Sequence, residues 1–206
     1  MNEQKKVPLW RNPYVLIFIG GAIVLTLMRP MLRRDPKPPP VDGVLPLFSL
    51  TSEQGEKMGS TELAGQVYVA NFLFTSCTTV CPLTVTSLQK LQKRYEERNV
   101  PVRIVSFSVD PNTDTPAKLR EYGQGYLGKD AKPDFTVWQL ATGTNKEVKA
   151  VADFFGLRYE IDPNDKTQFA HSLRTVVVAP DGKVRKVFSG NEWTTGELLK
   201  ELQTAL

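Results

Sequence analysis

Hydrophobic and polar positions along the chain change pattern in blocks that predict strands and helices in alternation. Short runs rich in β-branched and aromatic residues predict strands over 47–51, 66–74, 102–109, 135–140, 173–178 and 183–188. Apolar residues at helical spacing predict helices over 85–98, 115–122, 144–155 and from 194 onward. Strands that alternate with helices, followed by a hairpin and a last helix, indicate an α/β fold with helices on both faces of a sheet.

The chain before residue 45 follows a different pattern. Residues 1–11 form a short basic tail, and residues 12–28 carry no charge. This apolar stretch lies at the lower limit of about 17 residues for a helix that crosses a bilayer. We therefore predict a transmembrane anchor over 12–32, a proline-rich linker over 33–44 and a folded domain over 45–206. A cleaved signal peptide is the alternative, but no small-residue cleavage site follows the apolar stretch.

Charge limits the functions that the chain can have. The net charge of +4 is mild, and much of it lies before residue 38. No basic stripe interleaved with aromatic residues follows, so the composition argues against nucleic-acid binding. Basic residues flank the apolar stretch on both sides in nearly equal number, so the positive-inside rule does not decide its orientation. The simpler arrangement keeps the short N-terminus inside and exports the domain.

The only two cysteines, Cys77 and Cys81, follow the strand predicted over 66–74. Pro82 suits the first turn of a helix and disfavours helical backbone angles at the residue before it. We therefore expect Cys81 at the start of a helix and Cys77 on the loop that leaves the strand. A helix N-terminus favours anions and lowers the pKa of a nearby thiol.

Three interpretations of the two cysteines compete. They are inert buried thiols, a redox pair that cycles with its disulfide, or ligands of a soft metal. The C-x-x-x-C spacing permits a disulfide but differs from the C-x-x-C of thioredoxin-like oxidoreductases. Thr78-Thr-Val-Cys81 also reproduces the T-x-x-C pattern of peroxidases of the peroxiredoxin class, although the sequence identifies no positioned arginine.

His171 is the only histidine, and it precedes the strand predicted over 173–178. A lone histidine beside apolar residues is more often structural than a metal ligand. His171 reaches the two cysteines only if its strand runs antiparallel to the strand over 66–74. A Cys-Cys-His set would suit copper transfer, because thiolates hold Cu(I) and imidazole helps to accommodate Cu(II). For zinc the set resembles a catalytic site, but no general base stands beside it.

The chain from about Leu45 to Leu206 resembles the Sco/SenC family of copper-binding, thioredoxin-fold proteins. The matching motifs are Phe48-Ser-Leu-Thr with Gly55, Phe72-Leu-Phe-Thr-Ser-Cys-Thr-Thr-Val-Cys-Pro82, Val105-Ser-Phe-Ser-Val-Asp-Pro with Asp114-Thr-Pro116, and His171-Ser172. In one departure, Thr78-Thr79 stands where many members have Pro-Asp. That change removes a carboxylate, so we expect an altered copper affinity and redox poise with the same ligands.

The resemblance implies a thioredoxin-like central sheet with flanking helices and an added hairpin, preceded by the transmembrane helix. It also implies copper, as Cu(I) or Cu(II), bound by Cys77, Cys81 and His171, with Asp110 beside the ligands or involved in transfer. The implied role is assembly of the CuA centre of cytochrome c oxidase. The partner would be the copper-bearing subunit of that oxidase or another copper chaperone. The domain would face the periplasm from the inner membrane, and a thiol-disulfide reductase acting on the partner is the alternative.

Several polar residues and tryptophans also have simpler interpretations. Asp110 fits a turn, and Asp114 fits the N-cap of the helix that follows. The acidic run over 159–165 is typical of a solvated loop that can serve in partner docking. Trp138 and Trp193 are expected to pack in or near the core.

Overall fold

The computed structural model describes residues 13–32, 45–98, 100, 103–126, 134–161, 169–171, 174–190 and 193–205, with backbone alone at 25, 27–32, 160, 161 and 169–171. The chain divides into two compact units, Met1–Pro38 and Pro39–Leu206. The predicted basic tail over 1–11 and the predicted linker over 33–44 lie outside the described residues. The boundaries of the four predicted segments therefore stay predictions.

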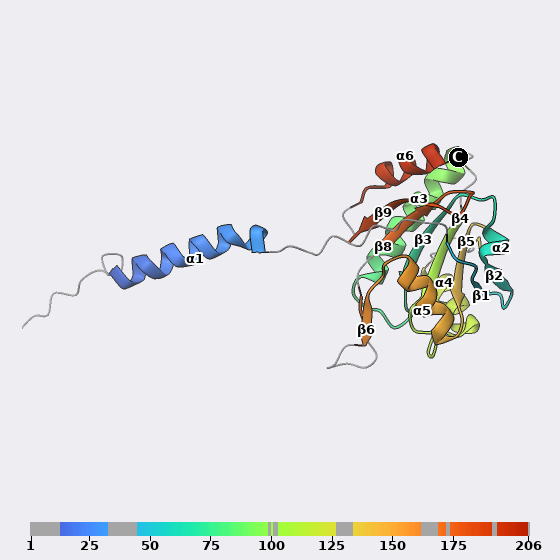
Figure 1. Cartoon of the computed structure of the whole chain (residues 1–206), viewed down its shortest axis with the longest axis horizontal. Coiled ribbons are helices and arrows are strands. Elements are labelled where there is room, and N and C mark those ends of the chain that lie inside the picture. The colour runs from blue at the N-terminus through green and yellow to red at the C-terminus, as the bar shows by residue number, and fades with distance from the viewer. Residues whose placement is uncertain are drawn as a thin grey trace, which may run out of the picture. The chain divides into compact units, whose positions relative to one another are not determined.

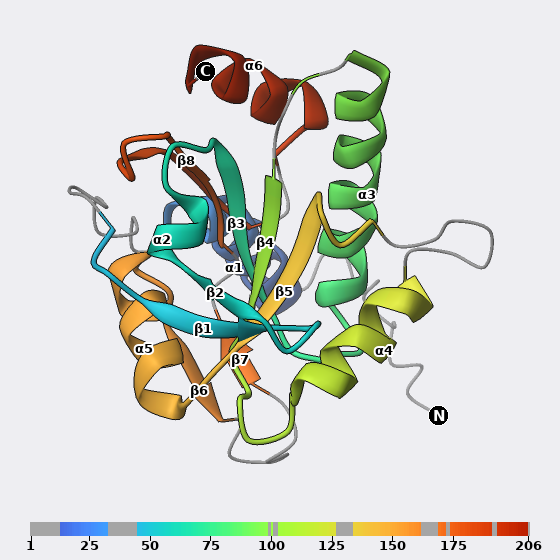
Figure 2. The ribbon, with the colours of Figure 1, turned by 90° about the vertical axis from the view of Figure 1, so that its right-hand side faces the viewer.

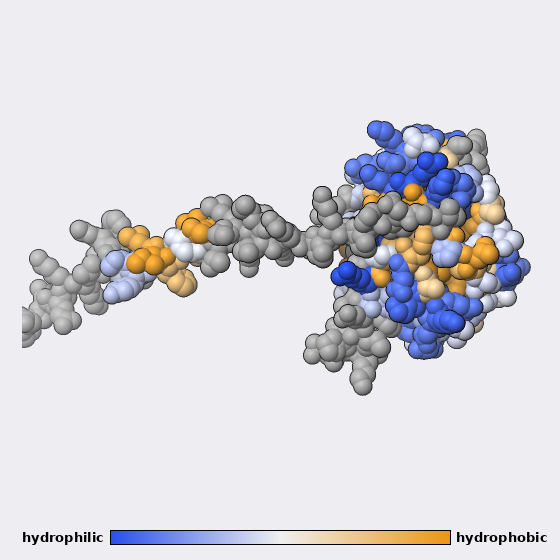
Figure 3. Space-filling view, viewed as in Figure 1, coloured by the Kyte–Doolittle hydropathy of each residue, from blue (hydrophilic) through white to orange (hydrophobic). Residues whose placement is uncertain are grey.

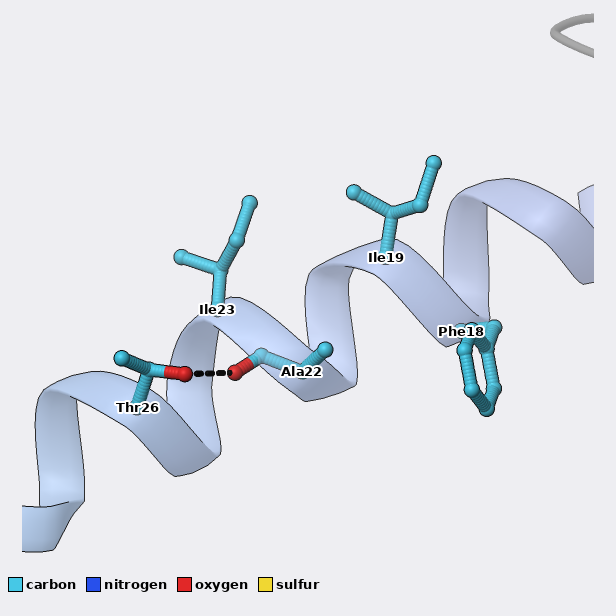
Figure 4. Close-up of a pocket in the computed structure, with 5 residues that line it drawn as sticks. All are labelled: Phe18, Ile19, Ala22, Ile23 and Thr26. Atoms are coloured by element: carbon cyan, nitrogen blue, oxygen red, sulfur yellow. Dashed lines mark hydrogen bonds between the residues drawn. The ribbon is translucent and has the colours of Figure 1, made fainter.

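The first unit contains α1 (Pro13–Leu32), which the apolar stretch forms. Most of its described apolar side chains are exposed, including Phe18 at 78% and Ile23 at 54%, and Figure 3 shows hydrophobic residues along it. Ile19 and Ile23 point to one side of the helix, and the Thr26 hydroxyl donates to the Ala22 carbonyl at 2.7 Å (Figure 4). Among the described residues, no helix combines the length and apolarity that a membrane crossing requires.

The second unit is built on a seven-stranded sheet with the order β2-β1-β5-β4-β3-β8-β9 (Figures 1 and 2). Its strands are β1 (Ser49–Ser52), β2 (Lys57–Gly59), β3 (Tyr68–Leu73), β4 (Arg103–Ser108), β5 (Trp138–Thr142), β8 (Arg174–Val178) and β9 (Val184–Ser189). A separate ladder pairs β6 (Tyr159–Ile161) with β7 (Phe169–His171). The mixed α/β architecture that the sequence predicts is confirmed.

Helices cover both faces of this sheet. They are α2 (Ser60–Leu63), α3 (Cys81–Arg98), α4 (Pro116–Tyr126), α5 (Asn145–Phe154) and α6 (Thr195–Ala205). Figure 2 shows α3 and α4 on one side of the sheet and α5 on the other. The α5 side is held by aromatic packing, because the Phe155 ring meets Phe72 at 5.8 Å and Phe107 at 6.2 Å between centroids.

The strand directions determine which ends of the chain meet. β3 and β4 are parallel neighbours, so both end at the same edge of the sheet. β8 runs antiparallel to β3, with Thr175 opposite Asn71 and Val177 opposite Val69, so β8 begins where β3 ends. The antiparallel arrangement on which the interpretation of His171 depends is therefore confirmed. The expected hairpin of β8 with β9 is present as well.

Two departures from the expected elements have local causes. The strand predicted over 135–140 begins only at Trp138, because Asp134 holds a turn in front of it. The Asp134 carbonyl accepts the Val137 and Trp138 N–H groups, and its carboxylate accepts the Thr136 N–H at 2.9 Å. The acidic run expected to be a loop begins as β6, whose three residues are too few for a recognisable pattern; its residues 162–165 lie outside the described part of the chain.

Candidate metal centre

The two cysteines lie at the corner between β3 and α3. β3 is buried at all six positions, which fixes the strand in the middle of the sheet. A tight turn follows, in which the Cys77 N–H donates to the Phe74 carbonyl at 3.1 Å. α3 then begins at Cys81, as the position of Pro82 predicts. Both side chains are buried, at 3% exposure for Cys77 and 1% for Cys81, whereas Thr78 and Thr79 between them are exposed.

The sulfur of Cys77 lies against the start of α3. The Cys81 backbone N–H donates to Cys77 Sγ at 3.3 Å, so the sulfur accepts one of the helix's first N–H groups. No disulfide joins these two described cysteines. The pKa of the Cys81 thiol is raised by a hydrogen bond with the Cys77 side chain and by burial. A hydrogen bond with the Phe74 backbone lowers it, but the net shift is upward. The lowered thiol pKa that the helix N-terminus predicts is therefore wrong for Cys81.

Asp114 lies beneath this corner and is completely buried. Its carboxylate accepts the Thr75 N–H at 3.1 Å, the Thr75 hydroxyl at 2.5 Å and the Ser108 hydroxyl at 2.5 Å. Burial raises the pKa of Asp114, and the hydrogen bonds from Ser108 and Thr75 act in the opposite direction. The charge of Asp114 is one of the smaller causes that raise the pKa of Cys81. Asp114 therefore lies within electrostatic range of the candidate ligand.

The expected N-cap role of Asp114 is wrong. α4 begins at Pro116, and the Thr115 hydroxyl accepts the Lys118 N–H at 3.3 Å, so Thr115 caps the helix. Asp110 does form the expected turn, since its carboxylate accepts the Thr113 N–H at 3.3 Å. Asp110 is buried at 8% exposure and adds to the rise in the pKa of Asp114. Its proposed influence on copper stays a prediction.

His171 ends β7, and its backbone pairs with Tyr159 of β6. Only this backbone position is described. Three residues later β8 begins, at the edge of the sheet where β3 ends and the cysteine loop leaves. Within the described residues, no group of three or more His, Cys, Asp or Glu side chains lies close enough to hold a metal ion. The structure thus brings Cys77 and Cys81 together and leads the His171 segment to the same edge.

The donor set fits a soft metal ion. Two buried sulfurs in close contact offer the ligands that Cu(I) selects, and no carboxylate oxygen that would favour a hard cation lies on the exposed loop between them. The same two sulfurs are placed to exchange electrons as a dithiol. Both cysteines also belong to the buried hydrophobic core, as the interpretation as inert thiols expects.

Sequence reasoning missed Thr75 and Ser108, and it did not find the supporting role of Asp114. The available signal was that two adjacent parallel strands end at one edge, so polar residues that follow both strands meet there. Trp138 and Trp193 are buried as expected, at 3% and 9% exposure.

The domain resembles known proteins in sequence and in fold. The profile of the SCO1/SenC family matches residues 38–206. The SCO1 protein homolog of Bacillus subtilis (strain 168) is 32% identical over 162 residues, which cover 77% of this chain and 80% of that protein. The structure of BsSco matches with a TM-score of 0.69 at 29% identity, covering 81% of this chain and 95% of that one. BsSco is described as having a disulfide switch and as a member of the Sco family of cytochrome c oxidase assembly proteins. Arabidopsis thaliana ScoI, solved with copper bound, shares the fold with a TM-score of 0.66 at 23% identity, covering 79% and 99%.

Proposed function

Because the chain belongs to the SCO1/SenC family, we propose that it binds copper as its cargo through Cys77, Cys81 and His171. The observation that carries the proposal is the contact of Cys77 Sγ with the Cys81 N–H at a buried strand-to-helix corner. β8 runs antiparallel to β3 and begins at the edge of the sheet where β3 ends, which supports His171 as the third ligand. Thiolates retain Cu(I), and an imidazole allows the same site to accept Cu(II).

The proposed role is assembly of the copper centre of cytochrome c oxidase. The acceptor would be the copper-bearing subunit of that oxidase, or another copper chaperone. The exposed loop at Thr78 and Thr79 supports this role, since it gives a partner access above two sulfurs that are themselves buried. The loop carries no charge, so a partner does not have to desolvate an ion there.

We also propose that α1 anchors the domain to the inner membrane, with the domain facing the periplasm. The support is the exposure of its apolar side chains and the absence of charge over 13–28. No described helix meets the requirements of a membrane span, so this proposal depends on the vesicle experiment described below.

Copper titration of the reduced protein tests the ligand set. We expect one site per chain and its loss in Cys77→Ser or Cys81→Ser. His171→Ala should weaken Cu(II) binding on the order of a hundredfold, because even indirect supports of a metal ligand cost about 10–100-fold. Asp110→Asn probes the residue expected beside the ligands and should weaken copper binding by about tenfold, the lower end of the range for an indirect support. Unchanged Cu(I) and Cu(II) affinity in His171→Ala would remove the histidine from the site.

A thiol-disulfide oxidoreductase is the second candidate, favoured by the contact between the two cysteines. This activity needs Cys77 and Cys81 but not His171, so the same variants separate the two functions. Reduction of a disulfide substrate that survives in His171→Ala but is lost in Cys81→Ser would favour it. The raised pKa of Cys81 counts against a peroxidase and against Cys81 as the attacking thiol of disulfide exchange, because the thiolate is the attacking species in both reactions.

A further inference from the structure

Asp114 has a set of contacts that its place in the sequence does not explain. It is 0% exposed, and its carboxylate accepts three hydrogen bonds from two residues. A buried carboxylate is costly unless its oxygens are hydrogen-bonded. The helix that follows is capped by Thr115, so α4 makes no use of this side chain. The backbone N–H of Asp114 donates to the Asp110 carbonyl at 2.8 Å, which holds the residue in its turn after β4.

The donors of these bonds come from two different strands. Ser108 is the last residue of β4, and Thr75 lies two residues beyond the end of β3. The Asp114 carboxylate therefore connects the end of β4 with the residues that follow β3, just before the cysteine loop begins. Thr75 contributes both its N–H and its hydroxyl, which fixes the backbone and the side chain together.

A short sequence of contacts leads from this carboxylate to both sulfurs. Thr75 lies inside the turn that the Cys77 N–H closes on the Phe74 carbonyl. Cys77 Sγ then accepts the Cys81 N–H. We propose that Asp114 is a positioning residue, which holds the loop through Thr75 so that the Cys77 sulfur stays against the Cys81 end of α3. This inference rests on the proposed use of the two cysteines as a copper or redox pair.

Positioning has a measurable consequence for the cysteine pair. A preorganised loop raises the effective concentration of one sulfur at the other and so favours any state that joins them. Loss of the Thr75 contact should therefore shift the dithiol–disulfide equilibrium toward the dithiol. We expect a shift of about tenfold, which is about 30 mV for a two-electron couple.

Two matched variants of the full chain test this inference. Thr75→Val and Ser108→Ala each remove one hydroxyl donor from the same carboxylate, but only Thr75 belongs to the cysteine loop. Equilibration with glutathione buffers should give the tenfold shift in Thr75→Val and less than about twofold in Ser108→Ala. Thr75→Ser keeps the hydroxyl and should restore the wild-type equilibrium. If Thr75→Val does not fold, Thr75→Ala, which removes the same hydroxyl and leaves the charge of Asp114 and its Ser108 contact in place, replaces it with the same expectation.

Equal shifts in Thr75→Val and Ser108→Ala, or no shift in either, would overturn the inference, because a merely structural carboxylate affects both alike. A shift that Thr75→Ser does not reverse would overturn it too. The readout requires no copper, so it remains informative if the wild-type chain binds none. In that case the copper proposal fails and the positioning of the redox pair is judged independently.

Discussion

At the scale of single residues, buried carboxylates join parts of this chain that are distant in sequence. Glu53 is 2% exposed, and its carboxylate accepts the Leu140 N–H at 2.8 Å while its own N–H donates to the Leu140 carbonyl at 2.9 Å. It thus extends the contact between β1 and β5. Burial raises its pKa, and the hydrogen bond from Leu140 and the positive charge of Arg120 are among the effects that oppose the rise.

The raised pKa of Glu53 makes stability depend on pH in a defined direction. The folded state binds the Glu53 proton more tightly than the unfolded state does. The stability that this proton adds to the fold is fully present below the ordinary pKa of 4.5, and it is lost as the pH rises through the raised pKa. We expect Glu53→Gln to lose less stability than wild type across this window. Urea unfolding at a series of pH values measures it, with the exposed Glu56→Gln of the same turn as control. Identical pH slopes in wild type and Glu53→Gln would contradict the assignment.

At the scale of elements, α5 illustrates how a local signal places a helix. Thr144 and Glu147 form a capping box, in which the Glu147 N–H donates to the Thr144 hydroxyl at 3.3 Å and the Thr144 N–H donates to the Glu147 carboxylate at 2.9 Å. The helix ends against the aromatic cluster through Phe155, and the chain then enters β6. Capping at one end and packing at the other therefore fix this helix beside the sheet.

Removal of the cap should weaken the fold without altering the cysteine corner. We expect Thr144→Ala to cost about 1 kcal/mol of unfolding free energy, because it leaves the Glu147 N–H without its partner. Thr144→Ser keeps the hydroxyl and should stay close to wild type. Chemical denaturation measures both variants. A loss as large in Thr144→Ser as in Thr144→Ala would show that the methyl group, and not the cap, carries the effect.

Elements with long periodic patterns or specific end signals were predictable from sequence, and those defined by tertiary contacts were not. The buried run of β3 and the Cys81-Pro82 start of α3 are local signals, and both predictions are confirmed. β6 and β7 are three residues each and exist through their mutual pairing. Asp114 was misassigned because its partners Thr75 and Ser108 meet it only once β3 and β4 lie side by side.

At the scale of the whole molecule, the sheet topology assembles the candidate site from three distant segments. The parallel pairing of β3 with β4 brings Asp114 beneath the cysteine loop, and the antiparallel β8 leads the His171 segment to the same edge. The sequence could not predict the direction of β8, because the hydrophobic pattern of a strand does not record its direction. His171 could therefore be proposed as a ligand only on the condition that β8 runs antiparallel to β3. The ligands Cys77, Cys81 and His171 could be proposed from the sequence, but the contacts of Asp114 that support the cysteine loop could not.

The unit that contains α1 leads to the last prediction, which concerns membrane attachment. The full chain should float with anionic phospholipid vesicles in a density gradient, and residues 39–206 should not, because the exposed apolar side chains of α1 lie only in the first unit. Ile19→Asp with Ile23→Asp should abolish flotation, since each aspartate costs about 2.5–3.5 kcal/mol at the centre of a membrane helix. Thr26→Ala on the same helix is the control and should float like wild type. Flotation of residues 39–206, or of the double aspartate variant, would assign membrane binding to the domain and refute α1 as the anchor.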